Sequence, residues 1–101
     1  MQEPERRFYN DLPKEAQDHW VSELKPHPAN AQLSPLTYTA YKKHAVSYLY
    51  CTDDEALPFS VQEMMVAGCG LDVRTHSCSA GHSPFSSQRQ AVLDTVVKMF
   101  E

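Results

Sequence analysis

Glycine is scarce in this chain of 101 residues, which contains only Gly68, Gly70 and Gly81. A glycine-rich loop for holding a phosphate group is therefore excluded. Long apolar runs are also lacking, since no stretch approaches the roughly 18 apolar residues that a membrane-spanning helix requires. The residues after Met1 are polar and charged, unlike the apolar centre of a secretory signal. We expect no phosphate-binding loop and no association with a membrane.

Basic residues are too few and too scattered to follow a nucleic acid backbone. Nine Lys and Arg oppose thirteen Asp and Glu, which gives a net charge of -4. Cysteine is also rare, and the three cysteines (Cys51, Cys69 and Cys78) form no CxxC pair. An odd number without such spacing favours buried thiols in a reducing compartment over a disulfide framework. We therefore expect a cytoplasmic protein that does not bind nucleic acid.

The chain nevertheless has enough apolar residues, 42% hydrophobic and 10% aromatic, for one small domain with a modest core. Asn10 and Asp11 are good helix caps, and apolar residues recur every four positions, so a helix is predicted over residues 11–24. A segment rich in Pro, Asn, Gln and Ser follows. We expect residues 1–43 to form a helical part and its connection, and residues 44–101 to form the main fold.

Two strands and two helices are predicted in residues 44–101. The nearly continuous apolar run over residues 45–51 indicates a central strand that is covered on both faces, and the alternating residues 72–78 indicate a more polar strand near an edge. Between them, Ser60 and Glu63 form a capping-box pattern for a helix that Gly68 or Gly70 can end. A second capping box, Ser87 with Gln90, opens a closing helix that extends to Glu101. The apolar residues of both helices are expected to be buried; they are Val61, Met64, Met65, Leu93, Val96, Val97 and Phe100. The fold class is therefore α/β, in the order β-α-β-α, with two parallel strands.

Asp54 and His82 follow these two strands. In parallel sheets reactive groups collect beyond the carboxyl ends of the strands, so the two side chains are expected to lie side by side. A carboxylate beside an imidazole fixes its tautomer and stabilises the imidazolium that forms when the other nitrogen takes a proton. Asp54 would orient and His82 would act as general base. Ordinary turn chemistry around Pro58 and in Gly81-His82-Ser83-Pro84 explains the same residues without any catalytic role.

At these residues the chain resembles the α/β-hydrolase superfamily, and specifically fungal esterase-like members near the plant methylesterase and hydroxynitrile lyase group. The resemblance rests on Tyr48-Leu-Tyr-Cys-Thr-Asp-Asp-Glu-Ala-Leu-Pro58, Val61-Gln-Glu-Met-Met65 and Ala80-Gly-His-Ser-Pro84, and upstream on residues 7–13 and 35–38. It implies that the chain is a carboxyl-terminal part of the hydrolase fold, with a remnant of the lid before it. It also implies that Asp54, rather than Asp53, is the catalytic acid and that His82 is the catalytic histidine.

The nucleophile of that family is lacking. No serine has a glycine two residues away on both sides, so no complete G-x-S-x-G elbow exists. Ser83 matches the first half of the pattern, but Pro84 has no N–H for an oxyanion hole. Cys69 lies at a predicted helix carboxyl end, which raises a thiol pKa rather than lowering it.

A zinc site formed by His76, Cys78 and His82 is the remaining chemical alternative, but their spacing matches no standard zinc pattern. No metal and no cofactor is expected. The resemblance implies a carboxylic ester hydrolase lineage in which this chain carries the acid and base and acts on a small ester only when another chain supplies the serine. A non-catalytic interaction module, or a pseudoenzyme fragment, that pairs through an open sheet edge is the alternative. Either reading leaves a thin sheet, so self-association or a complementing amino-terminal hydrolase half is the expected partner.

Overall fold

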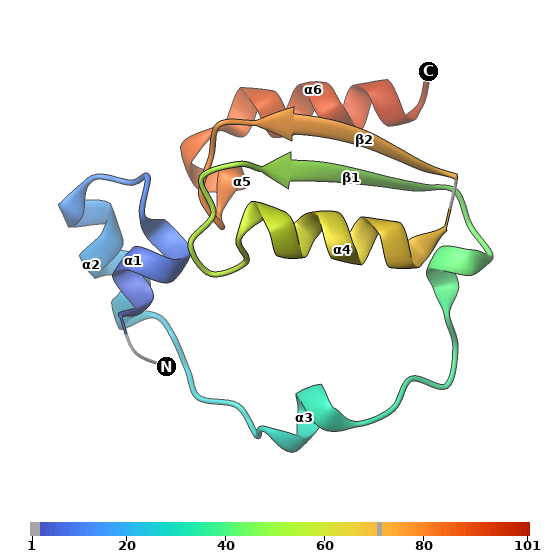
Figure 1. Cartoon of the computed structure of the whole chain (residues 1–101). Coiled ribbons are helices and arrows are strands. Elements are labelled where there is room, and N and C mark those ends of the chain that lie inside the picture. Colours follow the sequence, from blue (N-terminus) through green and yellow to red (C-terminus); the bar gives the residue numbers. More distant parts are fainter. Residues whose placement is uncertain (1–2, 71) are drawn as a thin grey trace.

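The computed structural model describes residues 3–70 and 72–101. Its centre is a parallel sheet of two strands, β1 (Val46–Cys51) and β2 (Val73–Cys78), which pair in register from Val46 with Val73 to Cys51 with Cys78. Helix α4 (Phe59–Cys69) connects the strands and lies on one face, while α6 (Arg89–Met99) lies on the other (Figure 1). The predicted α/β class with two parallel strands is confirmed.

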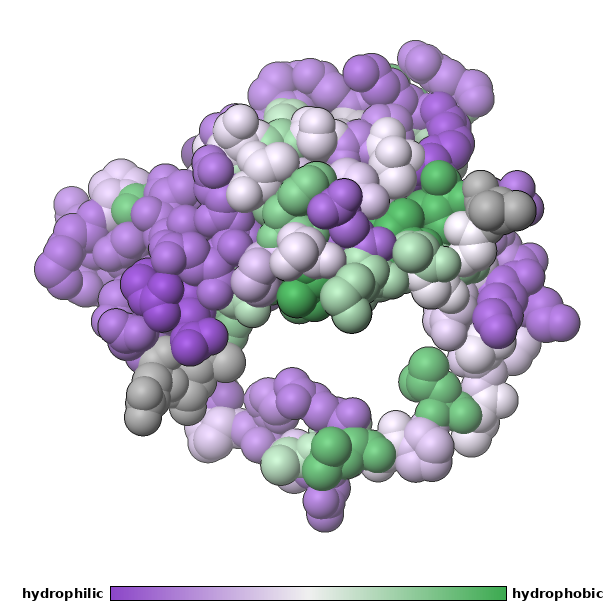
Figure 2. Space-filling model, viewed as in Figure 1, coloured by the Kyte–Doolittle hydropathy of each residue, from purple (hydrophilic) through white to green (hydrophobic). Residues whose placement is uncertain are grey.

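Five shorter helical elements complete the described residues. Helices α1 (Pro4–Tyr9) and α2 (Lys14–Ser22) lie beyond the carboxyl ends of the strands, close to α5 (Pro84–Ser87) (Figure 1). The connection from α2 to β1 carries the single turn α3 (Asn30–Leu33) and a short 3₁₀ helix (Ala40–Lys42). This connection swings away from the sheet, and the space-filling view still shows an opening between the two (Figure 2). The predicted sequence of elements lacked α1, α3 and α5.

Several predicted helix starts are wrong. Helix α2 begins at Lys14 after Pro13, and neither Asn10 nor Asp11 caps it. Helix α4 begins at Phe59 after Pro58, without a side-chain cap from Ser60. Helix α6 likewise begins at Arg89 without a cap from Ser87. The side chains of Asn10, Asp11 and Ser87 instead make hydrogen bonds to residues far away in the sequence. These long-range contacts replace the predicted helix caps.

The end of α4 agrees with the sequence. Gly70 follows the helix with a φ of 111°, a conformation that favours glycine. Gly68 lies within the helix. The prediction that one of these two glycines ends the helix is therefore confirmed, and Gly70 is the one.

The core is much smaller than the sequence suggests. Cys51 and Ala80 are the hydrophobic residues found buried among those described. Every residue of the predicted buried stripe of the closing helix is exposed, from 44% at Val96 on α6 to 86% at Phe100, which follows α6 as its C-cap. Met64 on α4 is 72% exposed. The predicted burial is wrong because two strands offer too little surface to cover both helices. For the same reason β1 is not a central strand here, since in the described sheet it has β2 as its one neighbour.

A candidate acid–base site at the strand ends

The loops that follow β1 and β2 bring Asp54 and His82 together. Nδ1 of His82 lies 2.9 Å from Oδ2 of Asp54. The loops are joined directly by their backbones, since Thr52 N–H donates to the carbonyl of Cys78 and Asp53 N–H donates to the carbonyl of Ala80. Parallel strands that end in register therefore place the acid and the histidine next to each other, as expected from their positions after the strands.

Asp54 is held in one orientation. Its side chain is only 5% exposed. Oδ1 accepts hydrogen bonds from the backbone N–H of Ala56, at 2.8 Å, and of Leu57, at 2.9 Å. This turn ends just before Pro58 and α4. Because one carboxylate oxygen is fixed by backbone donors, the other is directed at His82. Asp53, by contrast, is exposed.

His82 is the accessible member of the pair, with 38% of its side chain exposed. When Nδ1 carries the proton it donates to Asp54, and Nε2 is then the nitrogen that can accept a proton from another group. One side of the imidazole lies against the ring of Phe8, with ring centroids 5.2 Å apart and planes tilted by 34°. The pair thus has the geometry of an orienting carboxylate and a general base.

Ser83 stands next to the pair but is engaged elsewhere. Its hydroxyl donates to the carbonyl of Phe8 at 2.9 Å, and the residue is 4% exposed. Pro84 begins α5 directly after it. A buried hydroxyl that already donates to a carbonyl is poorly placed to attack a substrate. This agrees with the prediction from the sequence that Ser83 is not the nucleophile.

The other residues considered for chemistry do not join the pair. Among residues 3–70 and 72–101 no group of three or more His, Cys, Asp or Glu side chains is arranged to hold a metal ion. His76 lies on β2 opposite Leu49, and its Nε2 is buried without a hydrogen-bond partner in the described chain. Cys51 and Cys78 are register partners at the strand ends, and all three cysteines are free. Burial raises the pKa of the Cys51 thiol to about 12, so it is a poor nucleophile.

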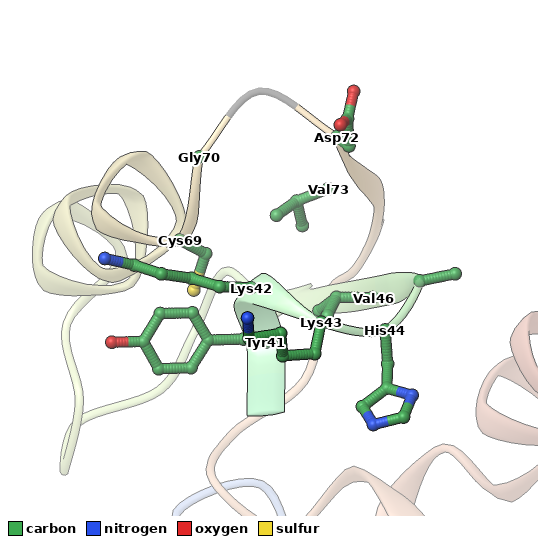
Figure 3. Close-up of a pocket in the computed structure, with 10 residues that line it drawn as sticks. Tyr41, Lys42, Lys43, His44, Val46, Cys69, Gly70, Asp72 and Val73 are labelled. Carbon is green, nitrogen blue, oxygen red and sulfur yellow. The ribbon is translucent and has the colours of Figure 1, made fainter. Parts of the chain in front are cut away.

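The described residues form cavities in two separate parts of the molecule. One of about 600 Å³ begins at Phe8 and is formed by α1 and by the end of α2 with the residues that follow; its lining is Pro4, Phe8, Val21, Leu24, Lys25, Pro26 and His27. The other, of about 580 Å³, lies at the amino ends of the strands (Figure 3) and is lined by Tyr41 to Val46, Cys69, Gly70, Asp72 and Val73. Phe8 lines the first cavity and also lies against the His82 ring, whereas the second cavity is at the opposite end of the strands from the acid–base pair.

The sequence reasoning missed the residues that surround the pair. Asn10 and Asp11 were expected to cap a helix, yet Asn10 Nδ2 donates to the carbonyl of Asp53 and Asp11 Oδ2 accepts from the N–H of Gly81. Phe8 was not predicted to contact His82. The signal in the sequence is slight: two polar residues that can cap a helix can equally bind backbone groups far along the chain.

In the part of the chain that the structure describes, no helix is long and apolar enough to cross a membrane.

Comparison with known proteins finds a hydrolase that is similar to most of this chain. The chain is 31% identical, over 92 residues, to a protein of Aspergillus novofumigatus (strain IBT 16806) named alpha/beta hydrolase nvfD. The match covers 91% of this chain and 35% of that protein, so the chain spans about a third of its relative's length. No protein-family model matches the chain, and no solved structure matches it. The similarity supports the predicted α/β-hydrolase relationship at the level of the superfamily.

Proposed function

We propose that this chain supplies the acid and the base of a carboxylic ester hydrolase site, with the nucleophilic serine provided by another polypeptide segment. The contact between His82 Nδ1 and Asp54 Oδ2 is the observation that carries the proposal. The similarity to an alpha/beta hydrolase over most of this chain supports it. The finer assignment to an esterase-like group near the plant methylesterases rests on the sequence motifs.

In the proposed reaction, the serine oxygen attacks the ester carbonyl carbon while Nε2 of His82 takes the hydroxyl proton. Asp54 stabilises the imidazolium that results. The bond to the alcohol then breaks, and His82 returns the proton to the leaving oxygen. A water molecule then attacks the acyl carbon while His82 takes one of its protons. The bond from that carbon to the serine oxygen breaks, the acid is released, and His82 returns the proton to the serine oxygen. Triad members act as a unit, so the isolated chain should show little turnover.

The cavity beside Phe8 is the proposed place for an apolar group of the ester. Phe8 both lines this cavity and lies against the His82 ring. The other apolar lining residues include Val21 and Leu24. An alkyl or aryl group bound there would be close to the histidine, with the ester carbonyl near Nε2. We therefore propose a small ester with one apolar substituent as the substrate class.

A complementing segment is the proposed partner. The outer edge of β1 has no strand beside it in the described sheet. Large apolar side chains also remain exposed on the two helices that flank the sheet, α4 and α6. An amino-terminal hydrolase half with a serine elbow would cover such a surface and complete the site. The same observations favour a second candidate, a non-catalytic module that binds another protein or a second copy through this edge.

The test uses a fluorophosphonate, which labels activated serines, on the purified chain and on mixtures with amino-terminal hydrolase segments that contain an elbow. We expect no labelling of this chain and labelling of the elbow segment only when both are present. His82→Ala and Asp54→Asn should abolish that labelling and ester hydrolysis, whereas the exposed His44→Ala should not. Labelling of the isolated chain, or failure of every complex that forms, would overturn the proposal and favour the interaction module.

A further inference from the structure

The residues that flank Asp54 and His82 along the chain are all held by one short segment. Arg6 Nη1 donates to Glu55 at 2.8 Å, and Asn10 Nδ2 donates to the carbonyl of Asp53 at 2.7 Å. These two contacts hold the neighbours of the acid on either side. Residues 6–11, which we call the amino-terminal brace, therefore bind the loop between β1 and α4 both before and after Asp54. We call this loop the acid loop.

The brace also binds the loop between β2 and α5, which contains His82 and which we call the histidine loop. Asp11 Oδ2 accepts from Gly81 N–H at 2.8 Å, and the Phe8 carbonyl accepts from the Ser83 hydroxyl at 2.9 Å. Asp11 Oδ2 also accepts from the Ser87 hydroxyl, so this one oxygen fixes both ends of the segment from Gly81 to α5. The brace thus binds the neighbours of His82 on either side as well.

The fit between the brace and the histidine loop is close. A Cβ atom on Gly81 would overlap Oδ1 of Asn10 and lie 3.0 Å from Oδ1 of Asp11. Those two oxygens are buried and have no hydrogen-bond partner among the described residues. They face the Cα of Gly81, where weak C–H···O contacts are available to them. Only glycine can approach the brace this closely.

We propose that Asn10 and Asp11 are positioning residues that set the distance between Asp54 and His82. Adjacent in the chain, they bind the residue immediately before the acid and the residue immediately before the histidine. Because the two side chains belong to neighbouring residues, the short distance between them keeps the two loops a fixed distance apart. The proposal deepens the proposed function, on which it rests, by giving the amino-terminal segment a role at the acid–base pair in addition to any role as a lid.

The tautomer of His82 reports this positioning without any need for turnover. A hydrogen bond from Nδ1 to a carboxylate determines which ring nitrogen carries the proton. We would measure the ¹⁵N shifts of the His82 ring at a pH well above the ordinary histidine pKa of about 6.5. The native chain should show the proton on Nδ1. The double variant Asn10→Ala/Asp11→Ala should shift at least half of the population to the Nε2-protonated form.

Matched variants separate positioning from stability. Lys14→Gln removes an exposed ion pair with Asp18 on α2 and should leave the tautomer unchanged. Asp11→Asn keeps an acceptor for Gly81 and Ser87 and should retain the native tautomer, even if the double variant loses its fold. An unchanged tautomer in a folded double variant would overturn the proposal, and so would unfolding of Asp11→Asn. If no complementing segment ever gives hydrolysis, the proposed function fails while the tautomer result stands.

Discussion

The side-chain amide of Gln62 takes the place of a neighbouring strand for Cys51. Its Oε1 accepts from the Cys51 N–H at 2.9 Å, and its Nε2 donates to the Cys51 carbonyl at 2.8 Å and to the Leu57 carbonyl at 2.8 Å. Both backbone groups of a strand residue point to the same edge. Gln62, which is 1% exposed, therefore covers the outer edge of β1 only at Cys51, the last residue of the strand.

Replacing this amide should be costly. Gln62→Leu leaves the Cys51 N–H and the Leu57 carbonyl without this partner, while the Cys51 carbonyl keeps only the Asp54 N–H at 3.3 Å. We therefore expect the free energy of unfolding to fall by about 3 kcal/mol, given 1–3 kcal/mol per unpaired buried group. Urea denaturation followed by circular dichroism measures the change. Gln90 bonds only to exposed Asp94, so Gln90→Leu serves as the control and should change stability little. Equal effects of the two substitutions would contradict this account.

Gly81→Ala should be destabilising because of the brace. The new methyl group must displace Asn10, and overpacking of this kind costs about 1–3 kcal/mol. Removing the obstacle should restore part of the loss, so the double variant Asn10→Gly/Gly81→Ala should be less sensitive to the alanine than the native background is. A double-mutant cycle of unfolding free energies measures this coupling. Strict additivity would show that the two residues do not meet in solution.

Stability should depend on the ionisation of Cys51. Burial raises the pKa of this thiol from 9.0 to about 12, and the neighbouring Cys78 adds to the shift. Between these values the unfolded chain loses the proton while the folded chain keeps it. The contribution is therefore fully present below pH 9.0 and is lost as the pH rises towards about 12. Unfolding midpoints measured across this range should fall less steeply in Cys51→Ala than in the native chain. Cys69→Ala is the control, and a native slope in Cys51→Ala would contradict the assignment.

Phe8 should change the NMR chemical shifts of the His82 ring protons. With the two ring centroids 5.2 Å apart, the ring current of Phe8 shifts the carbon-bound protons of the imidazole. In Phe8→Leu these protons should move towards their values in an unstructured histidine, whereas Phe8→Tyr should preserve the native shifts. A two-dimensional NMR spectrum of the aromatic region gives the measurement. Unchanged shifts in Phe8→Leu would place the ring away from the histidine in solution.

The main elements of the fold could be predicted because their signals are local. The apolar run before Cys51, the alternation before Cys78 and the glycine at the end of α4 each specify a conformation within a few residues. Burial could not be predicted in the same way. An apolar stripe such as that of Leu93 and Phe100 indicates which face of a helix avoids water, but not whether the chain contains a surface to cover it.

The surroundings of the site were missed for a related reason. The capping motifs of Asn10 and Ser87 describe what these side chains can do locally, while the structure uses them across 43 and 76 residues of sequence respectively. Helix α1 was missed because its six residues include four that are charged or proline, and none of them is buried. Contacts between distant segments decide such positions, and they leave no periodic pattern in the sequence.

The great sequence separation of the brace contacts bears on the order of folding. The hydrogen bonds from the brace to Gly81, Ser83 and Ser87 each close a loop of at least 70 residues, whereas β1, α4 and β2 meet within a far shorter stretch. Loop closure costs entropy that grows with loop length, so the brace contacts form late. We therefore expect the strands to pair before the brace binds the loops that carry the acid and the histidine.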